Sequence, residues 1–156
     1  MIPAENNHAA KLTVGPILFH WPAGKKLDFY VRLAAAAPVD TVYLGEVVCF
    51  KRTPLSGHLD DNIAQLLQKA GKKVIRSTLA EVMTKFDSQS VERICAMRDT
   101  MIEANDASAL YHLSGRPHTL GPFMNVYNEH ALEFLAGKGA THRDSQDSHP
   151  SNTTDC

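Results

Sequence analysis

The sequence is poor in cysteine, in clustered charge and in long apolar runs. It has three cysteines in 156 residues and a formal net charge of −1. So few, scattered thiols exclude a disulfide framework and suit a reducing compartment. No Lys/Arg run exceeds two residues, so the chain lacks the basic patch of a nucleic-acid or anionic-membrane binder. No apolar stretch is long enough to span a bilayer, and the N-terminus lacks signal-peptide character. We therefore expect a cytoplasmic protein.

The common catalytic and metal-binding motifs are also missing. The eight histidines are dispersed and form no H-E-x-x-H pattern. The chain contains no G-x-G-x-x-G, P-loop, G-x-S-x-G or C-x-x-C segment. These absences argue against dinucleotide-binding, nucleotide-hydrolysing, serine-hydrolase, zinc-protease and thioredoxin-like proteins.

What the sequence does contain is an alternation of β-rich and amphipathic segments, with a globular hydrophobic content of 44%. Such alternation predicts parallel βαβ units, in either a doubly wound open sheet or a (β/α)8 barrel. Because a full barrel takes about 250 residues, we expect roughly five βα units of a partial TIM-type barrel. The expected strands are 12–19, 41–44, 74–77, 100–104 and 118–124. The expected helices are 25–37, 60–70, 90–98, 107–113 and 129–136, with a helical turn or two over 79–85.

Both ends of the chain differ from this pattern. Residues 1–11 are interpreted as a loose tail, and residues 12–140 as the βα domain. Residues 141–156 contain no aliphatic side chain, so they cannot bury enough apolar surface to offset the entropy of ordering. We expect them to be disordered. Residues 139–141 look like the start of a sixth strand, which we expect not to form.

Candidate functional residues follow the expected strands, because the carboxyl ends of parallel strands form the functional face of βα folds. Cys49 is the sharpest candidate, since Lys51 and Arg52 can lower the pKa of its thiol and favour the thiolate. A buried, unreactive thiol is about equally probable from spacing alone. The other candidates for this pocket are His20, Glu46, Thr78, Glu103, Asn105, Asn125, Tyr127 and Asn128.

Several of these candidates have an ordinary structural alternative. Glu46 and Glu103 either pair across neighbouring strands or, as we favour, bind nearby cations or helix ends. Asp106 and Asn128 are better N-caps than catalysts, and Cys95 lies on the apolar stripe of a helix, where core packing is expected. His20 is either a base or ligand or a structural residue beside Trp-Pro.

Five segments, taken together in order and spacing, resemble the N-terminal half of the UbiV-type proteins of the collagenase-like peptidase family U thirty-two. The resemblance covers about residues 12–140. Its most specific parts are Tyr-Leu-Gly-Glu-x-x-Cys and Asn-x-Tyr-Asn. The segments are residues 12–22, 40–49, 77–80, 102–106 and 121–128.

The resemblance implies a component of oxygen-independent ubiquinone biosynthesis that supports anaerobic hydroxylation of a quinone precursor. It implies a heterodimer with a UbiU-type homologue and, in the full-length family, a [4Fe–4S] cluster held by four cysteines. Cys49 then corresponds to the first ligand. The other three belong to the second half of the family, which this chain lacks, so we expect a truncated or split protein without an intact cluster. The alternatives are a collagenase-like peptidase, which has little support because Cys49 lacks an evident histidine partner, and a non-catalytic fragment.

Overall fold

The computed structural model describes residues 11–35, 38–52 and 57–143, and within them an α/β protein with one parallel sheet of six strands. The expected tails at residues 1–10 and 144–156, and the loop around Pro54, lie outside the described residues. The strands are β1 (Leu12–Val14), β2 (Val39–Leu44), β3 (Lys73–Ser77), β4 (Met101–Ala104), β5 (His118–Leu120) and β6 (Ala140–Arg143). The α-helices are α1 (Ala23–Ala35), α2 (Gly57–Lys69), α3 (Lys85–Cys95), α4 (Ala107–Leu113) and α5 (Glu129–Gly137). Two short 3₁₀ helices, η1 (Phe50–Arg52) and η2 (Pro122–Met124), follow β2 and β5.

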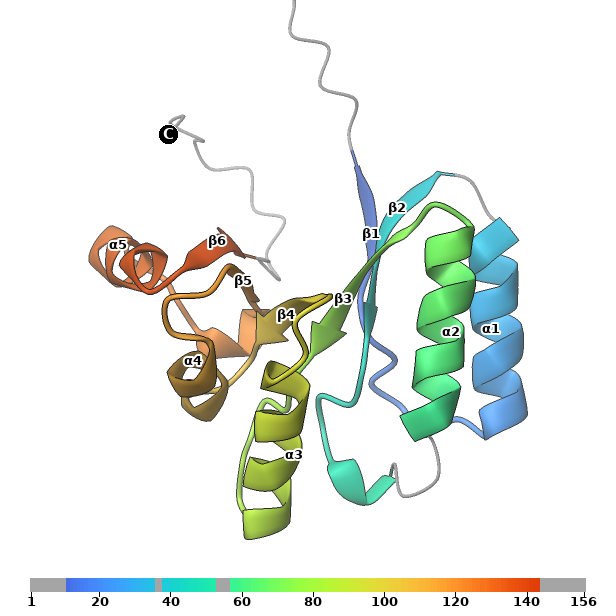
Figure 1. Cartoon of the computed structure of the whole chain (residues 1–156), viewed down its shortest axis with the longest axis horizontal. Coiled ribbons are helices and arrows are strands. Elements are labelled where there is room, and N and C mark those ends of the chain that lie inside the picture. The colour runs from blue at the N-terminus through green and yellow to red at the C-terminus, as the bar shows by residue number, and fades with distance from the viewer. Residues whose placement is uncertain (1–10, 36–37, 53–56, 144–156) are drawn as a thin grey trace, which may run out of the picture.

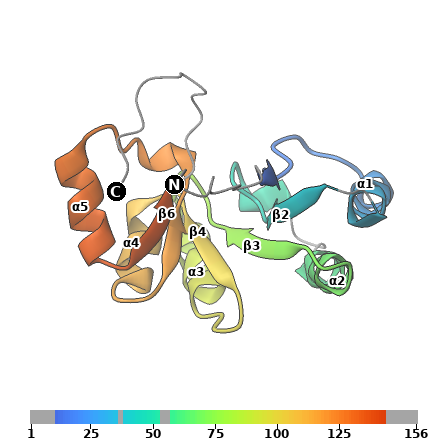
Figure 2. The ribbon, with the colours of Figure 1, turned by 90° about the horizontal axis from the view of Figure 1, so that it is seen from above.

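The strands are arranged in the order in which they occur along the chain, β1-β2-β3-β4-β5-β6 (Figure 1). A doubly wound sheet reverses its strand order partway across, so that alternative does not apply. Right-handed crossovers between sequential parallel strands place every helix on the same face of the sheet. In Figure 2 the sheet is curved and the five helices lie along its convex side.

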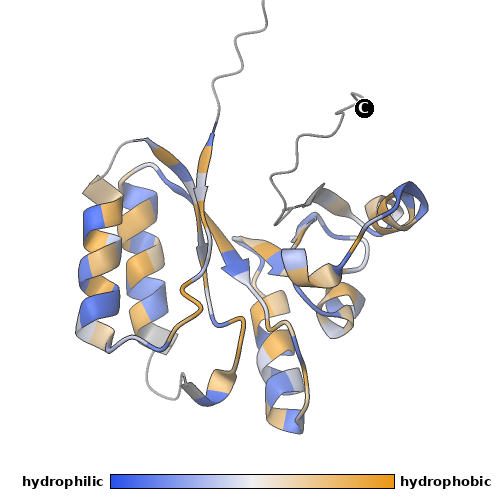
Figure 3. Ribbon diagram, turned by 180° about the vertical axis from the view of Figure 1, so that it is seen from behind, coloured by the Kyte–Doolittle hydropathy of each residue, from blue (hydrophilic) through white to orange (hydrophobic). Residues whose placement is uncertain are grey.

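The core between sheet and helices falls into three clusters. One joins α1 and α2 to β2 and β3 through residues such as Tyr30, Leu44 and Ile63. A second joins α3 and α4 to β4, and a third, smaller one packs α5 on β5 around Leu120 and Leu135. In Figure 3 the hydrophilic residues of α1 lie mainly on the side away from α2, as amphipathic packing requires.

Helix ends confirm several expectations from sequence. The side chain of Asp106 accepts the backbone N–H of Ser108 at the start of α4, and that of Asn128 accepts the N–H of Ala131 at the start of α5. Gly71 ends α2 with φ +78°, and the next N–H donates to the carbonyl of Leu67 over 3.0 Å. This left-handed C-terminal cap is the arrangement that favours glycine.

The expected helical turns over residues 79–85 are wrong, and α3 begins earlier than expected. The segment before Thr84 is irregular, and the Ala80 N–H donates to the carbonyl of Val47 over 2.9 Å. Thr84 then starts α3 through a capping box, in which its side chain accepts the N–H of Asp87 and the Asp87 carboxylate accepts the N–H of Thr84. The sequence pattern T-x-x-D carries this start signal, and the interpretation of residues 90–98 overlooked it.

Two expected strands are shorter than predicted. β1 ends at Val14, before Gly15-Pro16, and β5 ends at Leu120, before Pro122 begins η2. Proline cannot donate a ladder hydrogen bond, which accounts for both early ends.

The apolar residues of α1 are only partly covered by the core. Tyr30 is buried, and Phe29 and Leu33 pack beside it. Leu27 and Val31 are instead 40% and 46% exposed. The core face of α1 therefore contains Phe29, Tyr30 and Leu33 and leaves Leu27 and Val31 at its edge.

A sixth strand forms where the sequence predicted disorder, and this corrects the boundary at residue 141. β6 pairs in parallel with β5, with His118 opposite Ala140. Thr141 also donates its hydroxyl to the His118 carbonyl over 3.1 Å. A strand at the sheet edge is held by backbone hydrogen bonds, which do not require aliphatic side chains. The low aliphatic content of residues 141–156 was therefore not sufficient to predict disorder at residues 141–143. Among the described residues, no helix combines the length and the apolar character needed to cross a bilayer.

Candidate functional site

The side of the sheet opposite the helices carries an unusual number of polar residues. Val74 and Ile102 belong to the helix-facing clusters, and side chains alternate along a strand. Ser77 and Glu103 therefore lie on the other, inner face, where they are register partners, and Glu103 is opposite Thr119 of β5. All three are buried, at 1%, 3% and 2% exposure. This is a polar layer near the carboxyl ends of three adjacent strands.

Thr78, Glu103 and Asn105 form a connected buried network at this end of the sheet. The Thr78 hydroxyl donates to the Glu103 carbonyl over 2.9 Å and accepts the Asn105 N–H over 3.1 Å. The Asn105 amide donates to the Thr78 carbonyl over 3.1 Å and to Glu103 Oε2 over 2.9 Å. Asn105 therefore fixes the orientation of the Glu103 carboxyl group, since the same amide is held by the Thr78 carbonyl.

Gly121, which directly follows β5, closes over this network. A Cβ at that position would lie 1.9 Å from Asn105 Oδ1 and 3.0 Å from Glu103 Cδ. Any side chain at position 121 would therefore collide with the Asn105 amide, and only glycine fits there without displacing it. Gly121 also donates its N–H to the carbonyl of Ala104 over 2.8 Å, which holds β5 against β4 at this point.

Two buried oxygens of this region, Asn105 Oδ1 and Ser77 Oγ, have no hydrogen-bond partner in the described part of the chain. Buried polar atoms in proteins nearly always have one. With the Glu103 carboxylate beside them, these oxygens can accept hydrogen bonds from a polar group placed at the sheet's carboxyl end.

Cys49 lies apart from this network, in the loop between β2 and η1. Glu46 Oε1 accepts the backbone N–H groups of Val48 and Cys49 over 2.8 and 3.0 Å. Glu46 therefore shapes the turn that presents Cys49, whose side chain is partly exposed. The functional reading of Cys49 stays a prediction, but the alternative that it is a buried core thiol is wrong.

Glu46 and Glu103 do not form a pair across neighbouring strands. Glu46 follows β2 and Glu103 belongs to β4, and β3 lies between these two strands. Glu46 faces a cleft on the helix side of the sheet, whereas Glu103 is on the inner face. The sequence suggested adjacency because strand order had not been fixed.

Most of the remaining candidates have local structural partners. His20 is exposed, and beside it Trp21 stacks edge-on against Phe29 at 5.5 Å and under Lys25 at 4.4 Å. Asn125 has φ +51° and accepts the exposed Tyr127 hydroxyl over 3.1 Å, and Asn128 is the α5 N-cap. Lys51 is exposed in η1, and the side chain of Arg52 lies outside what the structure describes.

Cys95 is a core residue, as expected from its helical stripe. It is 2% exposed in the cluster between α3 and α4. Burial raises the pKa of its thiol to about 11, which the nearby Arg116 charge only partly offsets. It is therefore a neutral thiol at physiological pH.

The described residues do not fit a [4Fe–4S] cluster. Such a cluster takes four thiolates, and Cys49 is the one partly accessible cysteine of the described part, with Cys95 buried in the core. Within residues 11–35, 38–52 and 57–143, no three His, Cys, Asp or Glu side chains are grouped so that they could hold a metal ion.

Two residues at this end of the sheet, Ser77 and Gly121, were not among the candidates from sequence. Both fell inside expected strands, Ser77 in 74–77 and Gly121 in 118–124. The signal for Gly121 was available, because Gly-Pro after a short β-rich run marks a chain turn. No protein-family model matches the chain, and no solved structure matches it.

Proposed function

We propose that the chain is a UbiV-type component of oxygen-independent ubiquinone biosynthesis, with the fold of a partial (β/α)8 barrel. It acts in the cytoplasm with a UbiU-type homologue and supports hydroxylation of a quinone precursor. The sequential order of six parallel strands supports the barrel assignment, because singly wound parallel strands curl towards closure.

One observation carries the proposal. Three of the segments on which the resemblance rests, residues 77–80, 102–106 and 121–128, meet at the buried network of Thr78, Glu103, Asn105 and Gly121. Segments 20 or so residues apart in sequence that meet at the carboxyl ends of parallel strands are typical of a functional site. The proposal involves no iron–sulfur cluster in this chain, because the described residues do not fit one.

The proposal is tested by co-expressing the chain with a UbiU-type homologue in a bacterium that lacks its own UbiV-type protein. We expect the two proteins to co-purify, and ubiquinone to accumulate during growth without oxygen. Asn105→Ala, which releases the Glu103 carboxylate, should lower ubiquinone severalfold. Asn62→Ala, at an exposed position of α2, is the matched control. A soluble, folded chain that neither binds the homologue nor restores ubiquinone would show the proposed function to be wrong.

The ligand role proposed for Cys49 needs a protein with the complete ligand set. In a full-length UbiV-type relative, alanine at the position matching Cys49 should abolish iron and labile sulfide binding. The position matching Cys95 serves as the control, since a core thiol should tolerate alanine without loss of iron. Full iron occupancy in the first variant would contradict the ligand assignment.

A further inference from the structure

The helix layer is divided between α2 and α3. α1 and α2 share one core cluster, and α3 and α4 share another. Between the two helix pairs lies a cavity of about 510 Å³ whose floor is formed by the ends of β2 and β3. Pockets of about 300–1,000 Å³ are the size that binds small organic ligands. This cleft is on the helix side of the sheet, and it borders the inner-face polar layer at Ser77, while Thr78, Glu103 and Asn105 do not line it.

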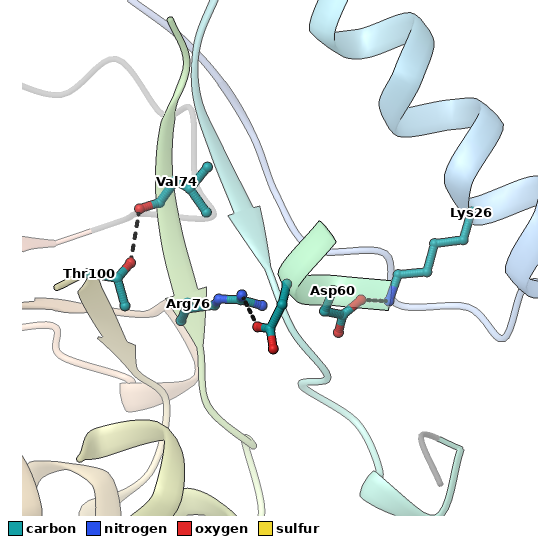
Figure 4. Close-up of polar contacts among 6 residues, drawn as sticks. Lys26, Asp60, Val74, Arg76 and Thr100 are labelled. Atoms are coloured by element: carbon teal, nitrogen blue, oxygen red, sulfur yellow. Dashed lines mark hydrogen bonds and ion pairs between the residues drawn. The ribbon is translucent and has the colours of Figure 1, made fainter. Parts of the chain in front are cut away.

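Arg76 reaches into this cleft from β3. Its side chain is only 12% exposed, and its guanidinium donates to Asp61 Oδ1 of α2 over 2.7 Å (Figure 4). A guanidinium carries five N–H donors, and Asp61 is its one partner among the described residues. Because a mostly buried cation requires further hydrogen bonds, donors of Arg76 remain for a molecule in the cavity.

A second guanidinium, that of Arg93, borders the same cleft from α3. It donates to the Ser90 hydroxyl over 2.9 Å. The carboxylates of the cleft are already engaged: Asp60 accepts a hydrogen bond from Lys26 over 2.6 Å, and Glu46 accepts two backbone N–H groups. Asp61 is likewise engaged by Arg76. Among the described residues, Arg76 and Arg93 each keep N–H donors that no protein acceptor takes, and these donors can bind an anionic group.

The wall opposite α2 is apolar. Phe86, Ile94 and Met97 line it from α3 and the residues just after it, and Phe86 is 53% exposed. An exposed phenylalanine in the same cleft as two guanidiniums offers a surface for a ring together with charges for its substituent.

We propose that the cleft between α2 and α3 binds a small aromatic anion, whose ring packs on Phe86, Ile94 and Met97 and whose carboxylate, sulfonate or phosphate group binds Arg76 and Arg93. Arg76 is the main specificity residue, because its fork of donors is held in place by Asp61. The proposal concerns a site distinct from the inner face and does not depend on the proposed function.

The test is a fluorescence titration of the full chain with 8-anilinonaphthalene-1-sulfonate, an aromatic sulfonate. We expect one binding site per chain, with affinity that falls as salt is raised. Arg76→Gln should weaken binding about tenfold, as loss of one charge-assisted pair implies, and Arg93→Gln should weaken it less. Arg32→Gln, at an exposed position of α1, is the matched control and should leave binding unchanged. The uncharged N-phenyl-1-naphthylamine should bind more weakly than the sulfonate.

Circular dichroism and a cooperative unfolding transition establish that each variant is folded, since the dye also binds loosened proteins. If Arg76→Gln does not fold, Arg76→Lys keeps the charge but loses the fork and should give an intermediate loss. A second variant, Ile94→Trp, fills the cleft without touching either arginine and should also reduce binding. Equal binding by the wild type and the arginine variants, or tighter binding of the uncharged dye, would overturn the proposal.

Discussion

Gly121→Ala is the substitution whose effect the geometry defines most sharply. The added methyl carbon would lie 1.9 Å from Asn105 Oδ1 and 2.6 Å from Asn105 Cγ. The backbone itself would not oppose the change, because Gly121 has φ −80° and ψ 166°, which alanine adopts freely. The effect therefore comes from collision with side chains, chiefly that of Asn105 and, at 3.0 Å, that of Glu103.

The magnitude follows from what must move. Asn105 is 1% exposed, and its amide holds the Thr78 carbonyl and the Glu103 carboxylate. Overpacking a buried site costs about 1–3 kcal/mol, and leaving a buried hydrogen-bonding group unpaired costs about 1–3 kcal/mol more. The smaller entropy of the unfolded alanine chain returns about 0.4–1 kcal/mol. We expect a net destabilisation of about 2–4 kcal/mol, or a Tm lower by roughly 6–12 °C.

The assay is urea unfolding followed by circular dichroism, with Gly24→Ala as the matched control. Gly24 lies in the first turn of α1, and a methyl group added there meets nothing within 4 Å. Alanine at that position should leave stability unchanged or raise it by up to about 1 kcal/mol, in line with helix propensity.

A double-mutant cycle separates the collision from other effects. Asn105→Ala removes the atom that the new methyl group would meet, so Gly121→Ala should destabilise the Asn105→Ala background much less than the wild type. We expect an interaction energy of at least about 1 kcal/mol. A Gly121→Ala protein as stable as the wild type, or strictly additive substitutions, would refute the reasoning.

Three further predictions concern α3 and its surroundings. Thr84→Ala removes the capping box and should lower the free energy of unfolding by about 1 kcal/mol, whereas Thr84→Ser should retain most of it; the check is urea unfolding of both variants. The hydrogen bond from Thr84 holds the pKa of Asp87 below its usual value. The stability that this bond contributes is therefore present above the ordinary aspartate pKa and is lost as the pH falls through the lowered pKa of Asp87. The difference in unfolding free energy between the wild type and Thr84→Ala should accordingly become smaller in acid. A second test uses Ellman's reagent at pH 8 on the Cys156→Ser variant. The reagent should modify Cys49 in the folded chain and Cys95 only after unfolding, since Cys95 is buried and its thiol has a pKa of about 11. Rapid modification of two thiols in the folded chain would contradict this. Arg116 donates to the Cys95 and Met97 carbonyls at the end of α3, so Arg116→Ala should destabilise by about 1.5–3 kcal/mol, measured beside Arg98→Ala as an exposed control.

Local signals in the sequence were sufficient for several elements of the fold. Asp106 and Asn128 each precede a helix and cap it, as their short polar side chains favour. The apolar run at residues 41–44 became part of β2, and Cys95 became a core thiol. In each case the deciding interaction joins residues a few positions apart, or depends on hydrophobic character alone.

Other features depended on interactions that local patterns do not contain. β6 forms because β5 offers it a backbone edge, although its residues 141–143 carry no aliphatic side chain. The segment before Thr84 stays irregular because Ala80 bonds to Val47, far away along the chain. Leu27 and Val31 fit the helical stripe of α1 yet remain exposed, since the packing partner decides which side of a helix is covered.

The sequence by itself determined that strands and helices alternate, where most of them begin, and that polar residues follow the strands. Only the tertiary structure decided which of those residues meet. Strand order placed β3 between β2 and β4, which separated Glu46 from Glu103 and brought Ser77, Thr78, Asn105 and Gly121 to Glu103. It also left α2 and α3 apart and so opened the cleft with Arg76. The physical reason is that local propensity depends on neighbours in sequence, whereas a site depends on the register and order in which distant strands pair.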